Sequence, residues 1–404
     1  MLASLLQDER WIAMKLSTDR ILTTHVGSLP RSAELSDLLL RKDHDEPVDT
    51  KTFDRVVREA VADNVARQAA IGIDVVSDGE ASKVSYATYI HERLSGFGGD
   101  QPRKPALDLA AYPEFRERIG RVAGKQAFRR PCCVGPVEVQ NRQQLRKDLA
   151  NLREAVGKTR VTETFMNAAS PGLITAFQPN QFYPSHRAYV EAVANAMKEE
   201  YEAIVSAGFI LQVDCPDLAM ARHTGFQDLS ETEFLKRAEL HVDALNHALV
   251  QIPADLARMH VCWGNYEGPH DHDIPLEKIV SIVLRAKPRA ILFEAANPRH
   301  QHEWSVWQDA RIPEDKILVP GLIEPCSASI EHPELVAQRI ARFTEIVGRS
   351  RVIAGTDCGF GTFAGMGKLE PEMVHKKLRS MVEGAAIASA RLWKRSLASA
   401  RYAN

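Results

Sequence analysis

Histidine, cysteine and glutamate side chains stand at the ends of three strand-like segments in the last third of the chain. His260 and Cys262 are one residue apart in the first of these segments. Side chains two positions apart on a strand point to the same face, so both would reach one site. Glu294 ends the next apolar segment, and Cys358 has the same position in the last one. Imidazole, thiolate and carboxylate groups are the ligands that zinc prefers, so these four residues predict a zinc site.

The composition of this ligand set indicates thiol chemistry. A carboxylate is the weakest of the four ligands for a thiophilic metal, so a substrate thiol could replace Glu294. Zinc would lower the pKa of that thiol, and the thiolate would attack an electrophilic carbon. Taken singly, a cysteine or histidine at a strand end is more often a packed core residue. A second histidine pair, His270 and His272, lies in a polar loop that could hold a metal weakly or simply be solvated.

Three further polar residues end other strand-like segments and would line the same mouth. They are Ser28, Glu80 and Asp214. Two carboxylates suit a substrate ammonium group, and a hydroxyl beside backbone N–H groups suits a substrate carboxylate. The alternative is that Glu80 and Asp214 cap neighbouring helices.

The elements that must position these residues alternate between strand and helix along the chain. Continuous apolar strands that alternate with helices predict a parallel sheet covered on both faces. Eight such units close into a (β/α)8 TIM barrel, in which the active site lies at the C-terminal ends of the strands. The expected strands begin near residues 21, 73, 160, 209, 258, 290, 316 and 351.

The predicted domain organisation is simple. Residues 1–20 form an N-terminal arm or short helix, and residues 21–404 form a single barrel. Residues from about 95 to 160, after the second strand and helix, break the alternation. We therefore expect an insertion there, with a small hairpin or sheet of its own.

Composition excludes several classes of protein. The 404 residues carry a formal net charge of −2, without a basic stripe for nucleic acid. No apolar run is long enough to span a membrane, and the first twenty residues are too charged for a signal peptide. Six cysteines in a chain of this length do not make a disulfide framework, which favours a reducing cytoplasm.

Seven short segments give the chain a family resemblance. It resembles the C-terminal catalytic barrel of cobalamin-independent methionine synthase, and the matching segments follow the family's order over about residues 20–392. They are Val26–Pro30, Ser77–Glu80, Val213–Pro216, His260–Cys262, Phe293–Glu294, Pro320–Glu324 and Thr356–Gly359.

The resemblance implies a zinc-containing barrel that activates a thiol for methyl or alkyl transfer. It implies that His260, Cys262, Glu294 and Cys358 bind zinc. It also implies that three residues surround the amino-acid part of homocysteine, namely Ser28, Glu80 and Asp214.

The sequence departs from the family pattern in three places. It has no room for the second, N-terminal barrel that helps to bind polyglutamyl folate, so it looks like the shorter, single-barrel members. The family's Asp-Glu-Pro after the fourth strand is Asp214-Cys215-Pro216 here. Its Asp-x-His after the seventh strand, whose histidine is thought to assist proton transfer to the leaving folate, is Glu324-Pro325-Cys326. The thiol half of the site is thus retained, and the catalytic residue of the donor half is not identified.

The leading hypothesis is a zinc-dependent methyltransferase that makes methionine from homocysteine. A second is a thiol transferase or C–S lyase that resembles epoxyalkane:coenzyme M transferase, for which Arg31 or Arg299 would bind the sulfonate. A third is a non-catalytic protein that binds zinc or a thiol. The expected partners are a small thiol and a methyl or alkyl donor, without nucleic acid or membrane. The sequence leaves open the donor, the oligomeric state (a homo-oligomer is compatible with it) and whether Cys215 or Cys326 approaches the metal.

Overall fold

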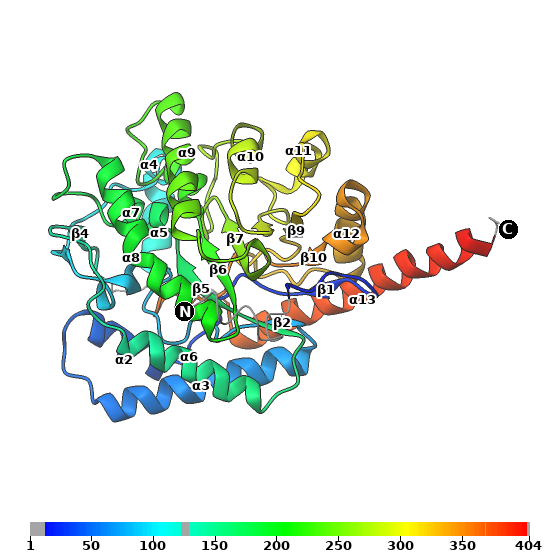
Figure 1. Cartoon of the computed structure of the whole chain (residues 1–404), viewed down its shortest axis with the longest axis horizontal. Helices are drawn as coiled ribbons and strands as arrows, with labels where there is room; N and C mark the ends of the chain where they lie inside the picture. The colour runs from blue at the N-terminus through cyan, green and yellow to red at the C-terminus, as the bar shows by residue number, and fades with distance from the viewer. Residues whose placement is uncertain (1–12, 123–128, 368, 402–404) are drawn as a thin grey trace.

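The computed structural model describes residues 13–122, 129–367 and 369–401. Six parallel strands form its main sheet, which curls as in a half-barrel (Figure 1). In spatial order they are β2 (Val75–Val76), β5 (Glu163–Ala169), β6 (Ile210–Asp214), β7 (Ala257–Val261), β8 (Ala290–Phe293) and β9 (Ile317–Pro320). The architecture is therefore α/β and compatible with a TIM-barrel-like fold.

A second parallel pair stands beside this sheet. It consists of β1 (Leu22–Thr23) and β10 (Ile353–Ala354). Parallel bridges join Leu318 to Val352 and Gly321 to Gly355, so β10 follows β9. On the other side, the N–H of Asp74 donates to the carbonyl of Thr23, 3.1 Å away.

Helices cover the outer face of the strands. They are α2 (Ala33–Asp43), α3 (Thr50–Ile71), α6 (Gln143–Gly157), α7 (Pro171–Phe177), α8 (His186–Ser206), α9 (Glu231–Ala248), α10 (Leu276–Leu284), α11 (Trp304–Asp309), α12 (Pro333–Val347) and α13 (Pro371–Arg401). The end of α13 projects from the body of the molecule (Figure 1). Within the described residues, no helix combines the length and apolarity that crossing a bilayer would require.

Local sequence explains where these helices begin. Ser230 starts α9 with a capping box. Its hydroxyl accepts from the N–H of Glu233, and the carboxylate of Glu233 accepts from the N–H of Ser230. Ser170 caps α7 by accepting from the N–H of Leu173, and Asp49 caps α3. The sequence analysis did not predict α2 or α7.

Two apolar layers hold the sheet in place. The outer layer packs helices against strands. The inner layer fills the space enclosed by the strands, with side chains such as Val75, Phe165, Ile210 and Leu292. Met14 belongs to this inner layer and is 4% exposed, and Ser17 is buried too, whereas most of residues 13–20 are exposed and none of them is helical. The rest of the predicted arm, residues 1–12, lies outside the described residues.

The segment between β2 and β5 interrupts the alternation of strand and helix. It contains the antiparallel strands β3 (Phe97–Gly98) and β4 (Cys132–Cys133), with helices α4 (Leu107–Ala111) and α5 (Pro113–Val122) between them. These elements lie beside α7 at one edge of the molecule (Figure 1).

Candidate active site

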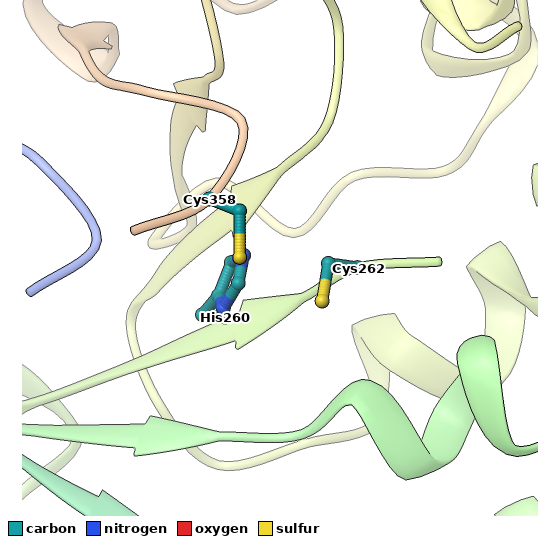
Figure 2. Close-up of side chains that lie close together, drawn as sticks. All are labelled: His260, Cys262 and Cys358. Carbon is teal, nitrogen blue, oxygen red and sulfur yellow. The ribbon is translucent and has the colours of Figure 1, made fainter. Parts of the chain in front are cut away.

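Three of the four predicted zinc ligands lie together. The donor atoms of His260, Cys262 and Cys358 are all within 4.8 Å of one another, and all three residues are buried. Figure 2 shows the imidazole and one thiol close together, with the other thiol beside them. His260 lies in β7, Cys262 directly follows this strand, and the turn after β10 brings Cys358. Donor atoms in a tetrahedral zinc site are roughly 3.3–3.8 Å apart, so this group fits a zinc ion.

The protonation of the three residues is mutually dependent. The Cys262 thiol donates to the sulfur of Cys358, which raises the pKa of Cys262 and lowers that of Cys358. Burial disfavours a charged His260, but the carboxylate of Asp214 and the sulfur of Cys358 together raise its pKa to about 9. Cys358 is therefore the more acidic of the two thiols, and a bound metal would displace the protons that the group still carries.

Glu294, the fourth predicted ligand, stands just outside this group. One of its carboxylate oxygens accepts from the N–H of Trp263 at 2.7 Å, and the other accepts from the side-chain amide of Asn297. Burial raises the pKa of Glu294, and its charge acts on both thiols. The carboxylate is thus near the metal-binding group but satisfied by the protein's own donors.

Asp357 fixes the strand end that carries Glu294. Its Oδ1 accepts from the N–H groups of Ala295 and Ala296, each at 2.9 Å, and its Oδ2 accepts from the N–H of Asn297 at 2.8 Å. Burial and the neighbouring charge of Glu294 raise its pKa to about 7 despite these donors. Because Asp357 directly precedes Cys358, its hydrogen bonds connect the backbone next to Cys358 with the turn that follows Glu294.

A cavity of about 140 Å³ opens onto the three donor residues, so it leaves room for a small substrate only. Its lining includes every residue predicted to hold the amino-acid part of the substrate. The polar lining residues are Ser28, Glu80, Tyr86, Asp214, His260, Cys262, Asn265, Tyr266, Cys358 and Thr362. Two carboxylates and no lysine or arginine occur among the described lining residues.

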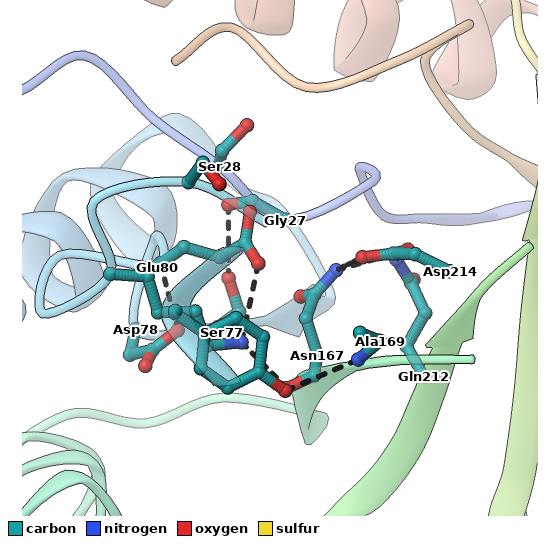
Figure 3. A network of polar contacts seen from close by, with 12 residues as sticks. Gly27, Ser28, Ser77, Asp78, Glu80, Asn167, Ala169, Gln212 and Asp214 are labelled. Carbon is teal, nitrogen blue, oxygen red and sulfur yellow. Dashed lines mark hydrogen bonds and ion pairs between the residues drawn. The ribbon is translucent and has the colours of Figure 1, made fainter. Parts of the chain in front are cut away.

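Asp214 joins the group of His260, Cys262 and Cys358 to the rest of the cavity. It is the register partner of His260, and its Oδ1 is 3.7 Å from the Nδ1 of that imidazole. The amides of Asn167 and Gln212 donate to its two oxygens at 3.0 Å each (Figure 3). The carboxylate therefore does not cap a helix, and its position is fixed from two strands.

Glu80 faces Asp214 across the cavity. Its backbone is left-handed, with φ of 55°, which is uncommon for a residue other than glycine. Burial raises the pKa of its carboxyl to about 7; the ammonium of Lys83, 3.3 Å away, opposes this rise, and the charge of Asp214 adds to it. Lys83 is itself held by the carbonyl of Asn167 at 2.8 Å. Glu80 is thus a buried acid, and a substrate ammonium beside it would stabilise the ionised form of its carboxyl group.

Ser28 lies against the turn that carries Cys358. Its carbonyl accepts from the N–H of Phe360 at 2.8 Å, and its hydroxyl accepts from the N–H of Gly361 at 3.3 Å. A Cβ at Gly359 would be 2.0 Å from the Ser28 hydroxyl oxygen, so only glycine allows this approach.

The residues that replace the family's Asp-x-His lie behind the cavity wall. Glu324 is half-buried and accepts from the N–H of Cys326 at 3.0 Å. The Cys326 thiol donates to Asn265 at 3.1 Å, and Asn265 lines the cavity. Cys215 is buried and donates to the carbonyl of Val213. Neither cysteine belongs to the three-residue donor group found in the described residues.

The alternative histidine pair does not form a metal site in the described part of the chain. His270 pairs with Asp273 at 2.9 Å and stacks on Tyr266, whereas His272 is exposed.

The sequence analysis missed the residues that orient the two carboxylates. Asn167 and Gln212 are polar residues inside otherwise apolar strands, and Gln212 shares the face of Asp214 because it is two positions earlier. That spacing was a usable signal. Lys83 comes three residues after Glu80, but nothing in the neighbouring sequence distinguishes it from a lysine on the surface.

Comparisons with known proteins show the family to which the chain belongs. Residues 21–387 match the model of a family described as "Cobalamin-independent synthase, Catalytic domain". A methionine synthase from Sulfolobus acidocaldarius is 25% identical over 375 residues, which cover 92% of this chain and 94% of that protein. One from Saccharolobus solfataricus is 25% identical over 370 residues, with 90% and 94% covered.

Two solved structures have the same fold. A B12-independent methionine synthase from Shewanella sp. W3-18-1, in complex with selenomethionine, has a TM-score of 0.68 at 19% identity and covers 93% of this chain and 99% of its own. A putative B12-independent methionine synthase from Listeria monocytogenes has a TM-score of 0.62 at 19% identity, with 91% and 98% covered.

Proposed function

Because this chain belongs to the family of cobalamin-independent synthase catalytic domains, we propose that it is a zinc-dependent methyltransferase that alkylates homocysteine. The observation that carries the proposal is the shared cavity. One wall consists of two thiols and an imidazole with the spacing of a zinc site, and the other carries the carboxylates of Glu80 and Asp214. A molecule with a thiol at one end and an ammonium at the other matches both walls.

The residues of the chain have separate roles in this proposal. His260, Cys262 and Cys358 would hold zinc, with Glu294 as the ligand that a substrate thiol replaces. When bound, zinc would lower the pKa of the substrate thiol. Asp214 and Glu80 would bind the ammonium group, and Ser28 would bind the carboxylate. Trp263 and Asn297 would hold the Glu294 carboxylate through their hydrogen bonds once it leaves the metal.

The charge of the cavity argues against a sulfonate thiol such as coenzyme M. A sulfonate would face two carboxylates without a lining cation among the described residues. Arg31 donates to the carbonyls of Glu80 and Gly361, and Arg299 is exposed. The open cavity above the donor group also argues against a purely structural metal, whose coordination shell would be closed.

We also propose that residues 21–404 form one closed (β/α)8 barrel with an insertion at about residues 95–160. The bridges between β9 and β10 and the hydrogen bond between Asp74 and Thr23 support closure. The inner apolar layer supports it too, since it takes side chains from both sheets. The antiparallel pair β3 and β4 supports a separate insertion. Cytoplasmic location and homo-oligomerisation stay predictions.

X-ray absorption at the zinc edge tests the proposed function directly. We expect the purified protein to hold one zinc with two sulfur ligands, and homocysteine to replace one N/O ligand by sulfur. A shell that no thiol changes would contradict the proposal. Cys262→Ser and Cys358→Ser should each lose zinc and methyl transfer. Cys326→Ser is the matched control, because this thiol lies at the same end of the strands but outside the donor group, and it should retain both.

A further inference from the structure

One tyrosine of the cavity wall stands beside the cysteines. Tyr266 lies in the loop between β7 and α10, four residues after Cys262, and it lines the cavity. Gly264 packs against both this ring and Met220, another lining residue, whose Cγ is 3.5 Å from the place of a Cβ at Gly264. The N–H of Met220 donates to the carbonyl of Cys262 at 3.2 Å. The wall that Tyr266 and Met220 form therefore belongs to the thiol end of the cavity.

The neighbours of the Tyr266 ring leave it little freedom to move. A Cβ at Gly264 would be 2.7 Å from the ring atom Cε1, and a Cβ at Gly268 would be 2.3 Å from Cε2. Only glycine therefore allows the backbone to come this close to both edges of the ring. The imidazole of His270 stacks on the ring with 4.4 Å between the centroids, and that of His223 does so at 6.2 Å. Side chains packed this closely do not shift freely, so the ring is a fixed part of the wall.

The insertion fixes the hydroxyl of the same tyrosine. Asp108 lies in α4 and is fully buried, and its Oδ2 accepts from the Tyr266 hydroxyl and from the N–H of His270, the latter at 3.1 Å. Burial, and next the bond to Asp108, raise the pKa of the Tyr266 hydroxyl, so it stays protonated and keeps donating. A hydrogen bond to a carboxylate is roughly twice as strong as one between neutral groups. One carboxylate of the insertion thus anchors the wall of the cavity.

We propose that Tyr266 limits the size of the substrate thiol and that Asp108 is the positioning residue that holds it. The inference rests on the proposed function, because it assigns the specificity of the same thiol site. In a cavity of about 140 Å³, a rigid ring at the thiol end leaves room for a short, unbranched thiol and excludes a bulky one. The insertion therefore takes part in the selection of the thiol, although none of its described residues lines the cavity.

Calorimetric titration of the zinc-loaded, full-length protein with two thiols tests the proposal. Homocysteine is the small thiol, and phenylmethanethiol is the bulky one, with an aromatic ring of the size that Tyr266 places in the wall. An apolar cavity made by removing a side chain can take up an aromatic ligand of matching size. We expect Tyr266→Ala to raise the affinity for phenylmethanethiol relative to that for homocysteine at least tenfold. This ratio is decisive, because a general weakening of the fold or of the zinc site would lower both affinities together.

Two milder variants keep the test decisive if Tyr266→Ala does not fold. Tyr266→Phe keeps the ring but loses the hydroxyl, and Asp108→Asn keeps the shape of the acceptor but loses its charge. Each should shift the ratio at least threefold toward the bulky thiol, because the ring can then give way. In the Tyr266→Phe background, Asp108→Asn should add less than twofold, since a positioning residue acts through the group that it holds. A full, additive effect there would overturn the role given to Asp108.

Tyr112→Phe is the matched control. The Tyr112 hydroxyl donates to Asp271 at 3.1 Å, so this tyrosine also joins the insertion to the loop between β7 and α10. Both residues of this pair are exposed, and neither lines the cavity. The ratio of the two affinities should therefore stay within 1.5-fold of that of the unsubstituted protein.

The unsubstituted protein separates this inference from the proposed function, since its zinc content and its homocysteine binding report on the thiol site itself. Absence of either would reject the proposed function together with the inference that rests on it. Normal zinc and homocysteine binding, with the same ratio of affinities in Tyr266→Ala and the unsubstituted protein, would overturn the inference alone. If Tyr266→Ala does not fold, an unchanged ratio in Tyr266→Phe has the same meaning.

Discussion

Replacement of Asp357 by asparagine should weaken the metal site although Asp357 is not a ligand. The carboxylate accepts three backbone N–H groups from the turn after Glu294, and Cys358 is the next residue along the chain. It is therefore the link that sets the position of one proposed ligand relative to another. Asparagine has nearly the same shape, so the change acts on hydrogen bonding rather than on packing.

The size of the effect follows from these contacts. The asparagine Oδ1 can keep the donors from Ala295 and Ala296, but its NH2 group would then face the N–H of Asn297 at the present 2.8 Å. One buried donor is left unpaired, at a cost of about 1–3 kcal/mol. Loss of the repulsion between Asp357 and Glu294 offsets part of this cost. Since residues that orient metal ligands typically contribute 10- to 100-fold to affinity, we expect zinc binding to weaken by about tenfold or more.

Competition with a chromophoric chelator at pH 8 would measure the zinc dissociation constant of the variant. Asp217→Asn is the matched control, because Asp217 is also a buried acid after a strand and bonds to Ser170 and His241 instead of the metal-binding turn. The control should bind zinc within twofold of the unsubstituted protein. Equal zinc affinity of Asp357→Asn and the unsubstituted protein would refute the role given to this carboxylate.

Three other predictions concern the substrate half of the cavity. The pKa of Glu80 is about 7 in the folded protein and about 4.5 in the unfolded chain, so between these pH values the folded state holds the extra proton. The free energy of unfolding should therefore fall as the pH rises from 4.5 to 7, by up to roughly 3 kcal/mol. Glu80→Gln should remove that part of the slope in urea unfolding at pH 5, 6 and 8, and an unchanged slope would contradict the assignment. Lys83→Met should raise the pH at which homocysteine binding is half-maximal by about one unit, because Lys83 favours the Glu80 anion; a profile like that of the parent would argue against this pairing. Gly359→Ala should destabilise the protein by about 1–3 kcal/mol and weaken homocysteine binding, because the new Cβ would overlap the Ser28 hydroxyl. Gly120→Ala is the control: its Cβ would meet open space, so thermal melting and homocysteine titration should show no loss of stability or binding.

Much of the site could be predicted because its residues lie at the ends of buried strands. His260 lies near the end of β7 and Cys262 directly follows the strand, two positions later, and the register of the sheet sets Asp214 beside His260. Period-two spacing and parallel pairing are readable from the chain, so the ligand side of the cavity follows from local pattern. The strand order of the six-stranded sheet follows in the same way, since sequential units are neighbours.

The parts that could not be predicted depend on pairings between distant segments. The Asp357 carboxylate meets N–H groups about sixty residues earlier in the chain, and Lys83 meets a carbonyl 84 residues away. No local spacing encodes such contacts. The place of the Arg103 guanidinium over the Phe177 ring is a further example, because it arises only when the insertion packs beside α7. α7 was not predicted because it has only seven residues and is apolar on nearly every side, so it shows no helical period. In α2 the spacing of Leu35, Leu38 and Leu39 is helical, and this signal was overlooked.

The two halves of the cavity meet at Asp214, so the thiol side and the amine side of the proposed site share one carboxylate. Asp214 is 3.7 Å from the imidazole of His260 and also lines the space opposite Glu80. In the metal-free protein its charge stabilises the His260 imidazolium. A bound zinc ion would displace the proton of that ring and add its own charge, which the two thiolates would balance. Asp214 would then keep its negative charge for a substrate ammonium while it still contacts the ring of a metal ligand, whereas Glu324 and Cys326 are absent from the lining of the cavity.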